Sequence, residues 1–239
     1  MAKTLEIPGS EAHPDWESLY RSRADEVAST RPIFTGDIFR DVLVSGVDEP
    51  ARKNIIILQH PCAMRTDGIS LVDRVLVAEI RTDRAFSARE WLRNFKKMPL
   101  PLLLGHNEAD AGYVALLNSL YFAKPKDLEL DHRIACLSQV GVNLLLQRWV
   151  HHNSRVIVET FQYQEVSSSA FEEVELIEEW CDERLEDGDE LERHAREALA
   201  WLREDSGNGK TWQELLADPQ TRSTVRRQMR SKLRELGNS

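Results

Sequence analysis

The stretch GDIFRDVLVSGVDEPARKNIIIL, residues 36–58, holds two runs of β-branched and aromatic side chains on either side of a turn. The runs Ile38–Val44 and Asn54–Gln59 predict strands, because such side chains favour an extended, half-buried backbone. The intervening residues 45–50 include Ser, Gly, Asp and Pro, which are typical of turns. The chain therefore begins its regular structure with two strands joined by a turn.

The rest of the chain continues with strands and then changes to helices. Further strand-like segments are residues 69–80, 113–122 and 133–137, and Ser87-Ala88-Arg89-Glu90 is a capping-box pattern that predicts a short helix over 87–96. From Gly141 the apolar residues recur every three or four positions, which predicts a helix over 141–162. Strands followed by helices indicate an α+β protein. We expect residues 33–139 to form a small, strongly bent β-barrel with the 87–96 helix inserted.

Helices are also predicted at both ends of the chain. Apolar residues within His13–Ser29 predict an N-terminal helix in the segment 1–32, and helices of the segment 140–203 are expected to pack on the barrel. One of these opens at the capping box Ser169–Glu172, and the next is capped by Asp189 after Gly188. Residues 204–218 are predicted to be a linker with one helical turn at its end. Residues 219–239 are predicted to be a basic amphipathic helix.

Charge is distributed unevenly along the chain. The net charge is -9, but about a dozen acidic residues fall within 172–192, whereas 221–239 is strongly basic. The apolar stripe of the terminal helix needs a packing surface. We therefore expect residues 219–236 to dock on a partner protein or on a second copy of the chain. Alternatively, the acidic helices pair with the basic terminal helix of the same chain.

Composition excludes several classes of protein. No run of about 18 to 20 apolar residues predicts a membrane span, and the first residues lack the apolar segment of a signal peptide. Three cysteines form neither a disulfide framework nor a CxxC zinc pattern, so we expect a cytoplasmic protein. The GxGxxG, Walker, HExxH and GxSxG motifs are absent from the sequence. We expect no cofactor and no bound metal.

A candidate site follows the second predicted strand, where the sequence reads His60-Pro61-Cys62 with Arg65 and Asp67 beyond. A histidine beside a cysteine can favour the thiolate, and an arginine adds positive charge. Asp67 can orient either group through a hydrogen bond. The alternative is that Cys62 is a small buried residue and that His60 and Pro61 only end the strand.

Other titratable residues have weaker claims to a site. Cys136 lies in an apolar run and Cys181 on an apolar helix stripe, so both are predicted to be core residues. His132 can join His60 across the sheet or lie in a surface loop. The predicted helix 141–162 carries four polar residues at helical spacing that form either a phosphate-binding face or a solvated one: Arg148, His151, His152 and Arg155.

The segment Gly36-Asp37-Ile38-Phe39, followed by Ala51-Arg52-Lys53 and the run 54–58, resembles the opening of MazF/PemK-type toxins. That family begins with a Gly-Asp-Ile strand and an Arg-Pro second strand of a small SH3-like barrel. The resemblance covers residues 34–60, with a weaker echo through about 160. Here Lys53 replaces the proline, and the second strand ends in His60-Pro61-Cys62. The chain also resembles uncharacterised bacterial proteins with a GDIF strand and a strand ending in His-x-Cys.

The resemblance implies an SH3-like barrel and a role in a bacterial toxin–antitoxin or defence system. Members of the toxin family cut single-stranded RNA with an arginine near the second strand, a position that Arg52 approaches here. The expectation is therefore a protein that cuts or binds RNA, with Arg52, His60, Cys62 and Arg65 as candidate catalytic residues. The alternative is a non-catalytic protein-interaction subunit of such an assembly.

Overall fold

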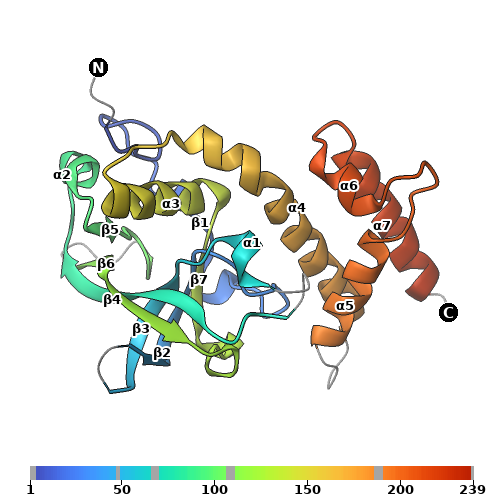
Figure 1. Ribbon diagram of the computed structural model, residues 1–239, viewed down its shortest axis with the longest axis horizontal. Helices are drawn as coiled ribbons and strands as arrows, with labels where there is room; N and C mark the ends of the chain where they lie inside the picture. The colour runs from blue at the N-terminus through green and yellow to red at the C-terminus, as the bar shows by residue number, and fades with distance from the viewer. Residues whose placement is uncertain (1–3, 47–48, 66–69, 106–110, 186–190, 238–239) are drawn as a thin grey trace. The chain divides into compact units, whose positions relative to one another are not determined.

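The computed structural model describes residues 4–46, 49–65, 70–105, 111–185 and 191–237 (Figure 1). These residues form two compact units. Unit 1 comprises residues 1–29, 34–64 and 71–165, and unit 2 comprises 30–33, 65–70 and 166–239. Among the described helices, none is both long and apolar enough to cross a lipid bilayer.

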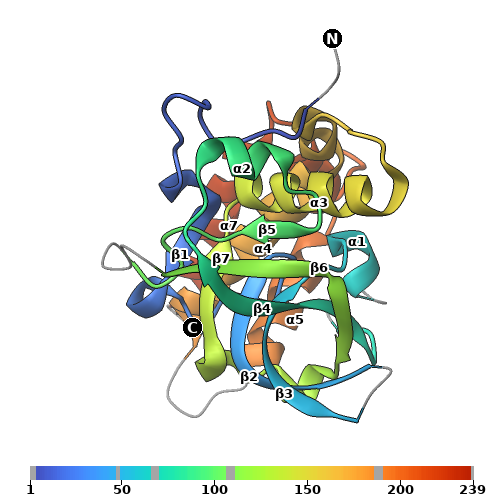
Figure 2. The ribbon, with the colours of Figure 1, turned by 90° about the vertical axis from the view of Figure 1, so that its left-hand side faces the viewer.

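Unit 1 is built on an antiparallel sheet with strand order β1-β7-β2-β3-β4-β6-β5 (Figure 2). The strands are β1 (Tyr20–Arg23), β2 (Asp37–Ser45), β3 (Ala51–Ile57), β4 (Val75–Arg84), β5 (Lys97–Pro99), β6 (Ala111–Ala123) and β7 (Arg133–Leu137). The quoted stretch therefore forms two neighbouring strands, as predicted. The predicted third strand, residues 69–80, is shifted to β4, and part of that range lies outside the described residues.

The sheet curves into a partial ring. The far end of β2 also pairs with β6, with Val44 opposite Ala123 and Ser45 opposite Phe122, so that β2, β3, β4 and β6 follow one another around the ring. The pairing register shifts within β2, between Phe39 and Val42, and such irregularities bend strands. The predicted α+β class, a strongly bent sheet followed by a helical C-terminal region, is confirmed at this level.

The apolar run of β3 lies at the centre of this sheet. Ile55, Ile56 and Ile57 are all fully buried. Because successive side chains of a strand point to opposite faces, burial of all three means that both faces are covered. A strand that is buried on both faces has an unbroken apolar run in its sequence instead of alternating apolar and polar residues.

Among the described residues, three α-helices lie wholly in unit 1: α1 (Pro61–Met64), α2 (Ala88–Arg93) and α3 (Gln139–Ser154). Helices α2 and α3 lie on the same side of the sheet (Figures 1 and 2). The predicted capping box of α2 is confirmed, because Ser87 accepts a hydrogen bond from the amide of Glu90 and the Glu90 side chain accepts one from Ser87. At Gly141 in α3, a Cβ would lie 2.2 Å from the carbonyl oxygen of Leu19, so only glycine permits this close approach.

Two predictions about helices are wrong. Residues 13–29 contain two short 3-10 turns around β1 in place of a helix, because Tyr20–Arg23 pairs with β7, and this tertiary pairing overrides the local pattern. The predicted 141–162 helix is interrupted. α3 ends at Ser154, Arg155 has a positive φ of 61°, and α4 (Thr160–Arg184) begins beyond the β-branched run 156–158.

Helix α4 begins in unit 1 and continues into unit 2, where it packs with α5 (Leu191–Leu202), α6 (Trp212–Ala217) and α7 (Arg222–Gly237). Its start lies nine residues before Ser169, so the second predicted capping box is inside the helix. Gly188 and Asp189 lie outside the described residues. The segment 204–218, predicted to be a linker, holds the bridge between Asp205 and Thr211 and then α6.

The apolar stripe of α7 is buried within unit 2. Val225, Met229 and Leu233 belong to the same hydrophobic cluster as Trp180 and Trp201. The stripe is therefore already covered by the chain itself, whereas docking of residues 219–236 on a partner or a second copy stays a prediction.

The basic face of α7 meets the acidic face of α4. Arg226 lies 2.7 Å from a carboxylate oxygen of Glu172 and 2.9 Å from one of Glu175, and Arg230 lies 2.6 Å from one of Glu179. These residues recur at helical spacing along both helices, so the pairs form a ladder between them. The intrachain alternative for the acidic and basic segments is confirmed.

Candidate functional site

The residues predicted from sequence to form a site do not converge. Arg52 lies near the start of β3, is exposed, and pairs with Asp41 at 3.1 Å. His60 lies beyond the other end of β3. From Arg52 to Ile57 alone, a strand spans roughly 16 Å, at about 3.3 Å per residue. Arg52 and His60 therefore do not act on one small group together.

The contact between His60 and Cys62 involves the backbone. The amide of Cys62 donates to Nδ1 of His60 at 3.3 Å, and the thiol of Cys62 is exposed. Burial lowers the pKa of His60 below its ordinary value, so the ring is neutral at pH 7. A neutral ring does not supply the positive charge that would favour a thiolate. The alternative that Cys62 is a core residue is wrong.

The Arg65 side chain contacts the backbone. The guanidinium of Arg65 donates to the carbonyl oxygen of Ile33 at 2.7 Å. Asp67 lies outside the described residues. The two other cysteines, Cys136 and Cys181, are buried as predicted.

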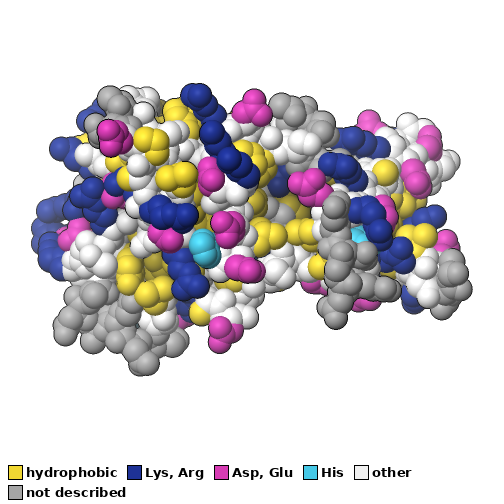
Figure 3. Space-filling view, turned by 90° about the horizontal axis from the view of Figure 1, so that it is seen from below, with side chains coloured by type: hydrophobic (Ala, Val, Ile, Leu, Met, Phe, Trp, Pro, Cys, Tyr) yellow, Lys and Arg dark blue, Asp and Glu magenta, His cyan; other side chains and the backbone are white. Residues whose placement is uncertain are grey.

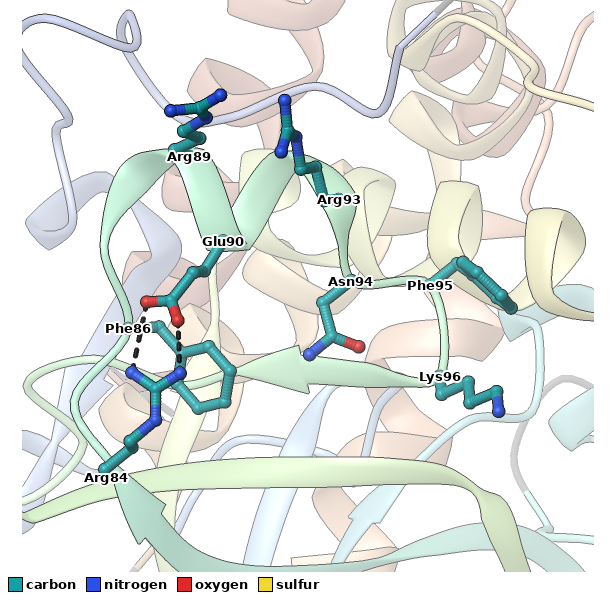
Figure 4. Close-up of a pocket in the computed structure, with 8 residues that line it drawn as sticks. All are labelled: Arg84, Phe86, Arg89, Glu90, Arg93, Asn94, Phe95 and Lys96. Carbon is teal, nitrogen blue, oxygen red and sulfur yellow. Dashed lines mark hydrogen bonds and ion pairs between the residues drawn. The ribbon is translucent and has the colours of Figure 1, made fainter.

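A different part of unit 1 forms a groove, with a volume of about 590 Å³, beside α2 (Figure 4). We call it the α2 groove. Its walls come from the end of β4, from α2 and from the segment leading into β5, and they combine basic and aromatic side chains. The lining residues are Arg84, Phe86, Arg89, Glu90, Arg93, Asn94, Phe95 and Lys96.

One wall of the α2 groove is a fixed ion pair above an aromatic ring. Both terminal nitrogens of Arg84 donate to the carboxylate of Glu90, and the guanidinium carbon lies 5.5 Å from the centroid of the Phe86 ring. Arg84 and the hydrogen bonds from Ser87 lower the pKa of Glu90 to about 2. The pair is therefore ionised at neutral pH, and its two charges compensate each other.

The remaining cations of the α2 groove are uncompensated. Among the residues that the structure describes, Arg89, Arg93 and Lys96 have no carboxylate partner, and all three are exposed. Arg89 and Arg93 extend from the outer side of α2, away from the Arg84–Glu90 pair (Figure 4). Being one helical turn apart, they are neighbours on the helix surface. Three like charges close together form a local positive field that an anion would relieve.

The end of α3 adds a fourth cation. The guanidinium of Arg155 lies over the Phe95 ring at 4.3 Å from its centroid, and His151 meets the same ring edge-on at 5.7 Å. Arg155 is exposed. This part of the predicted 148–155 face therefore lies beside the α2 groove.

Arg148, predicted to lie on a surface face, is fully buried. It donates to the carbonyl oxygens of Trp91 at 2.9 Å and of Asn94, and lies 4.4 Å from the centroid of the Trp91 ring. These carbonyls end α2, where helical partners are lacking. Burial lowers the pKa of Arg148 to about 9, which still leaves a cation at pH 7. Arg148 thus holds the C-terminal end of α2 in place through these hydrogen bonds.

The basic composition of the segment that forms the α2 groove is visible in the sequence, but we did not predict a site there. Residues 81–97 contain six basic residues and two acidic ones, in a chain whose net charge is -9. Figure 3 shows Lys and Arg side chains gathered at the left-hand end. A basic run interleaved with Phe86 and Phe95 is typical of nucleic-acid-binding surfaces.

No family model and no curated protein matches the chain. Within the described residues, no cluster of three or more His, Cys, Asp or Glu side chains is placed to hold a metal ion.

Proposed function

We propose that unit 1 binds RNA through the α2 groove. The observation that carries the proposal is the set of uncompensated cations Arg89, Arg93 and Lys96 beside aromatic rings. Elsewhere in the described chain, arginines such as Arg226 and Arg52 face carboxylates. A polyanion would supply the missing negative charge and release counterions as it bound.

The negative net charge of the chain is compatible with this proposal. Ions screen charges farther apart than about 8 Å at physiological salt. An RNA phosphate at the α2 groove would therefore respond mainly to the cations nearest to it, Arg89, Arg93, Lys96 and Arg155. We expect binding of moderate affinity that falls steeply with added salt.

We further propose that the partial ring of β2, β3, β4 and β6 is an SH3-like barrel that serves as the scaffold for the α2 groove. The resemblance of residues 34–60 to MazF/PemK-type toxins supports this description and a role in a toxin–antitoxin or defence system. The separation of Arg52 from His60, and the neutral ring of His60, favour binding over cleavage.

Fluorescence anisotropy with a labelled 12-nucleotide RNA tests the proposal. Replacing Arg89 and Arg93 together by alanine should weaken binding on the order of tenfold at 100 mM salt. It should also reduce the slope of log K against log salt by about 1.4, since each lost phosphate contact removes about 0.7.

The matched control replaces Arg40 and Lys126, two exposed cations of unit 1 outside the α2 groove, by alanine. It changes the net charge equally and should leave both the affinity and the slope close to those of the wild type. Equal losses in the two double variants, or no binding by the wild type at 50 mM salt, would refute the proposal.

A further inference from the structure

Arg84 is held as a flat, outward-facing plane. Its guanidinium is tied to Glu90 by two parallel hydrogen bonds and rests over the ring of Phe86. Two bonds between a guanidinium and a carboxylate hold both groups in one plane. Yet 67% of the Arg84 side chain remains exposed. The guanidinium carbon lies 5.5 Å from the centroid of the Phe86 ring, and much of the Arg84 side chain is open to the α2 groove.

Asn94 places hydrogen-bond donors beside this plane. Its Oδ1 accepts a hydrogen bond from the amide of Lys97 at 3.2 Å, which fixes the orientation of the side chain. The amide nitrogen is consequently turned toward Phe86 in Figure 4. Among the described residues, no acceptor is hydrogen-bonded to this nitrogen. The Arg84 guanidinium and the Asn94 amide nitrogen thus lie in the same α2 groove.

We propose that the Arg84–Glu90 plane is a stacking platform for one nucleobase, with the amide of Asn94 donating to an acceptor on the edge of that base. The inference rests on the proposed RNA-binding function and adds a base subsite to it. Bases splayed out of a strand stack on arginine planes as well as on aromatic rings. Every base carries a carbonyl oxygen or ring nitrogen that accepts a hydrogen bond, so the subsite does not require a particular sequence.

This geometry favours single-stranded ligands over duplexes. A base in a duplex is already stacked on its neighbours and paired along its edge, so it would have to leave the helix to reach Arg84. The phosphates flanking a stacked base in a single strand can meet the cations of Arg89, Arg93 and Lys96. The α2 groove should therefore favour a single strand over a duplex of equal length.

The test compares two labelled eight-unit oligomers with the same phosphates, oligouridylate and an abasic analogue, by fluorescence anisotropy. The wild type should bind the oligomer with bases about 5- to 150-fold more tightly, as expected for one stacked base. Arg84→Lys, which keeps the charge but loses the plane, should move the ratio of the two affinities toward one. Phe86→Leu, which removes the ring beneath the plane, should act in the same direction.

Arg81→Lys is the matched control, because Arg81 lies on the same strand, is similarly exposed and pairs with Glu79 outside the α2 groove. It should leave the ratio unchanged, and circular dichroism should verify the fold of every variant. Equal affinities of the wild type for the two oligomers would overturn the base subsite while RNA-backbone binding stands. Failure to bind either oligomer would overturn both proposals.

Discussion

Arg148→Met should destabilise unit 1 by about 2–4 kcal/mol. The substitution removes two charge-assisted hydrogen bonds to the carbonyls of Trp91 and Asn94, which contribute about 1.5–3 kcal/mol each. It also removes the cation–π contact with Trp91, which contributes about 1–2 kcal/mol. Relief of the buried charge offsets several kcal/mol of these losses. Met retains much of the apolar volume of the side chain and adapts to irregular space.

Thermal unfolding followed by circular dichroism measures this effect. At about 2–4 °C per kcal/mol for a chain of this size, the midpoint should fall by roughly 5–15 °C. Arg155→Met is the control at the C-cap of the same helix, because the exposed guanidinium of Arg155 only covers a ring. It should cost less than about 1 kcal/mol. If Arg148→Met unfolds at or above the wild-type temperature, the buried cation is a net cost, and Trp91 alone holds α2.

Two further predictions concern titratable groups. In the native protein, iodoacetamide should label Cys62 while the buried Cys181, whose pKa burial raises to about 12, reacts only on unfolding. His60→Ala should leave the labelling rate of Cys62 at pH 7 within about twofold, because the ring is neutral there, and a large fall would restore its predicted role. The lowered pKa of Glu90 implies stability that is present above pH 4.5 and lost as the pH falls toward 2. The difference in melting temperature between wild type and Glu90→Gln should therefore shrink progressively below pH 4.5, and a difference at pH 2.5 as large as that at pH 7 would contradict the pairing with Arg84.

Local patterns were sufficient for many elements of the fold. The β-branched runs in residues 36–58 predicted β2 and β3, and the capping box at Ser87 predicted the start of α2. These signals are local because a strand preference or a capping hydrogen bond depends on residues within a few positions of each other. The helix predicted over residues 13–29 is wrong for a non-local reason. Tyr20–Arg23 becomes a strand only because it pairs with β7, more than a hundred residues away in sequence.

The candidate site shows the same division. The sequence alone determined that residues 81–97 are basic and interleaved with aromatic rings, and that His60 and Cys62 are neighbours. The tertiary structure alone decided that Arg148 is buried beneath α2 while Arg93 is exposed and uncompensated. The two arginines are chemically identical. Their roles differ because the backbone carbonyls of Trp91 and Asn94, over fifty residues away in sequence, lie within hydrogen-bond reach of Arg148. A buried guanidinium is tolerated only where such distant partners replace its water.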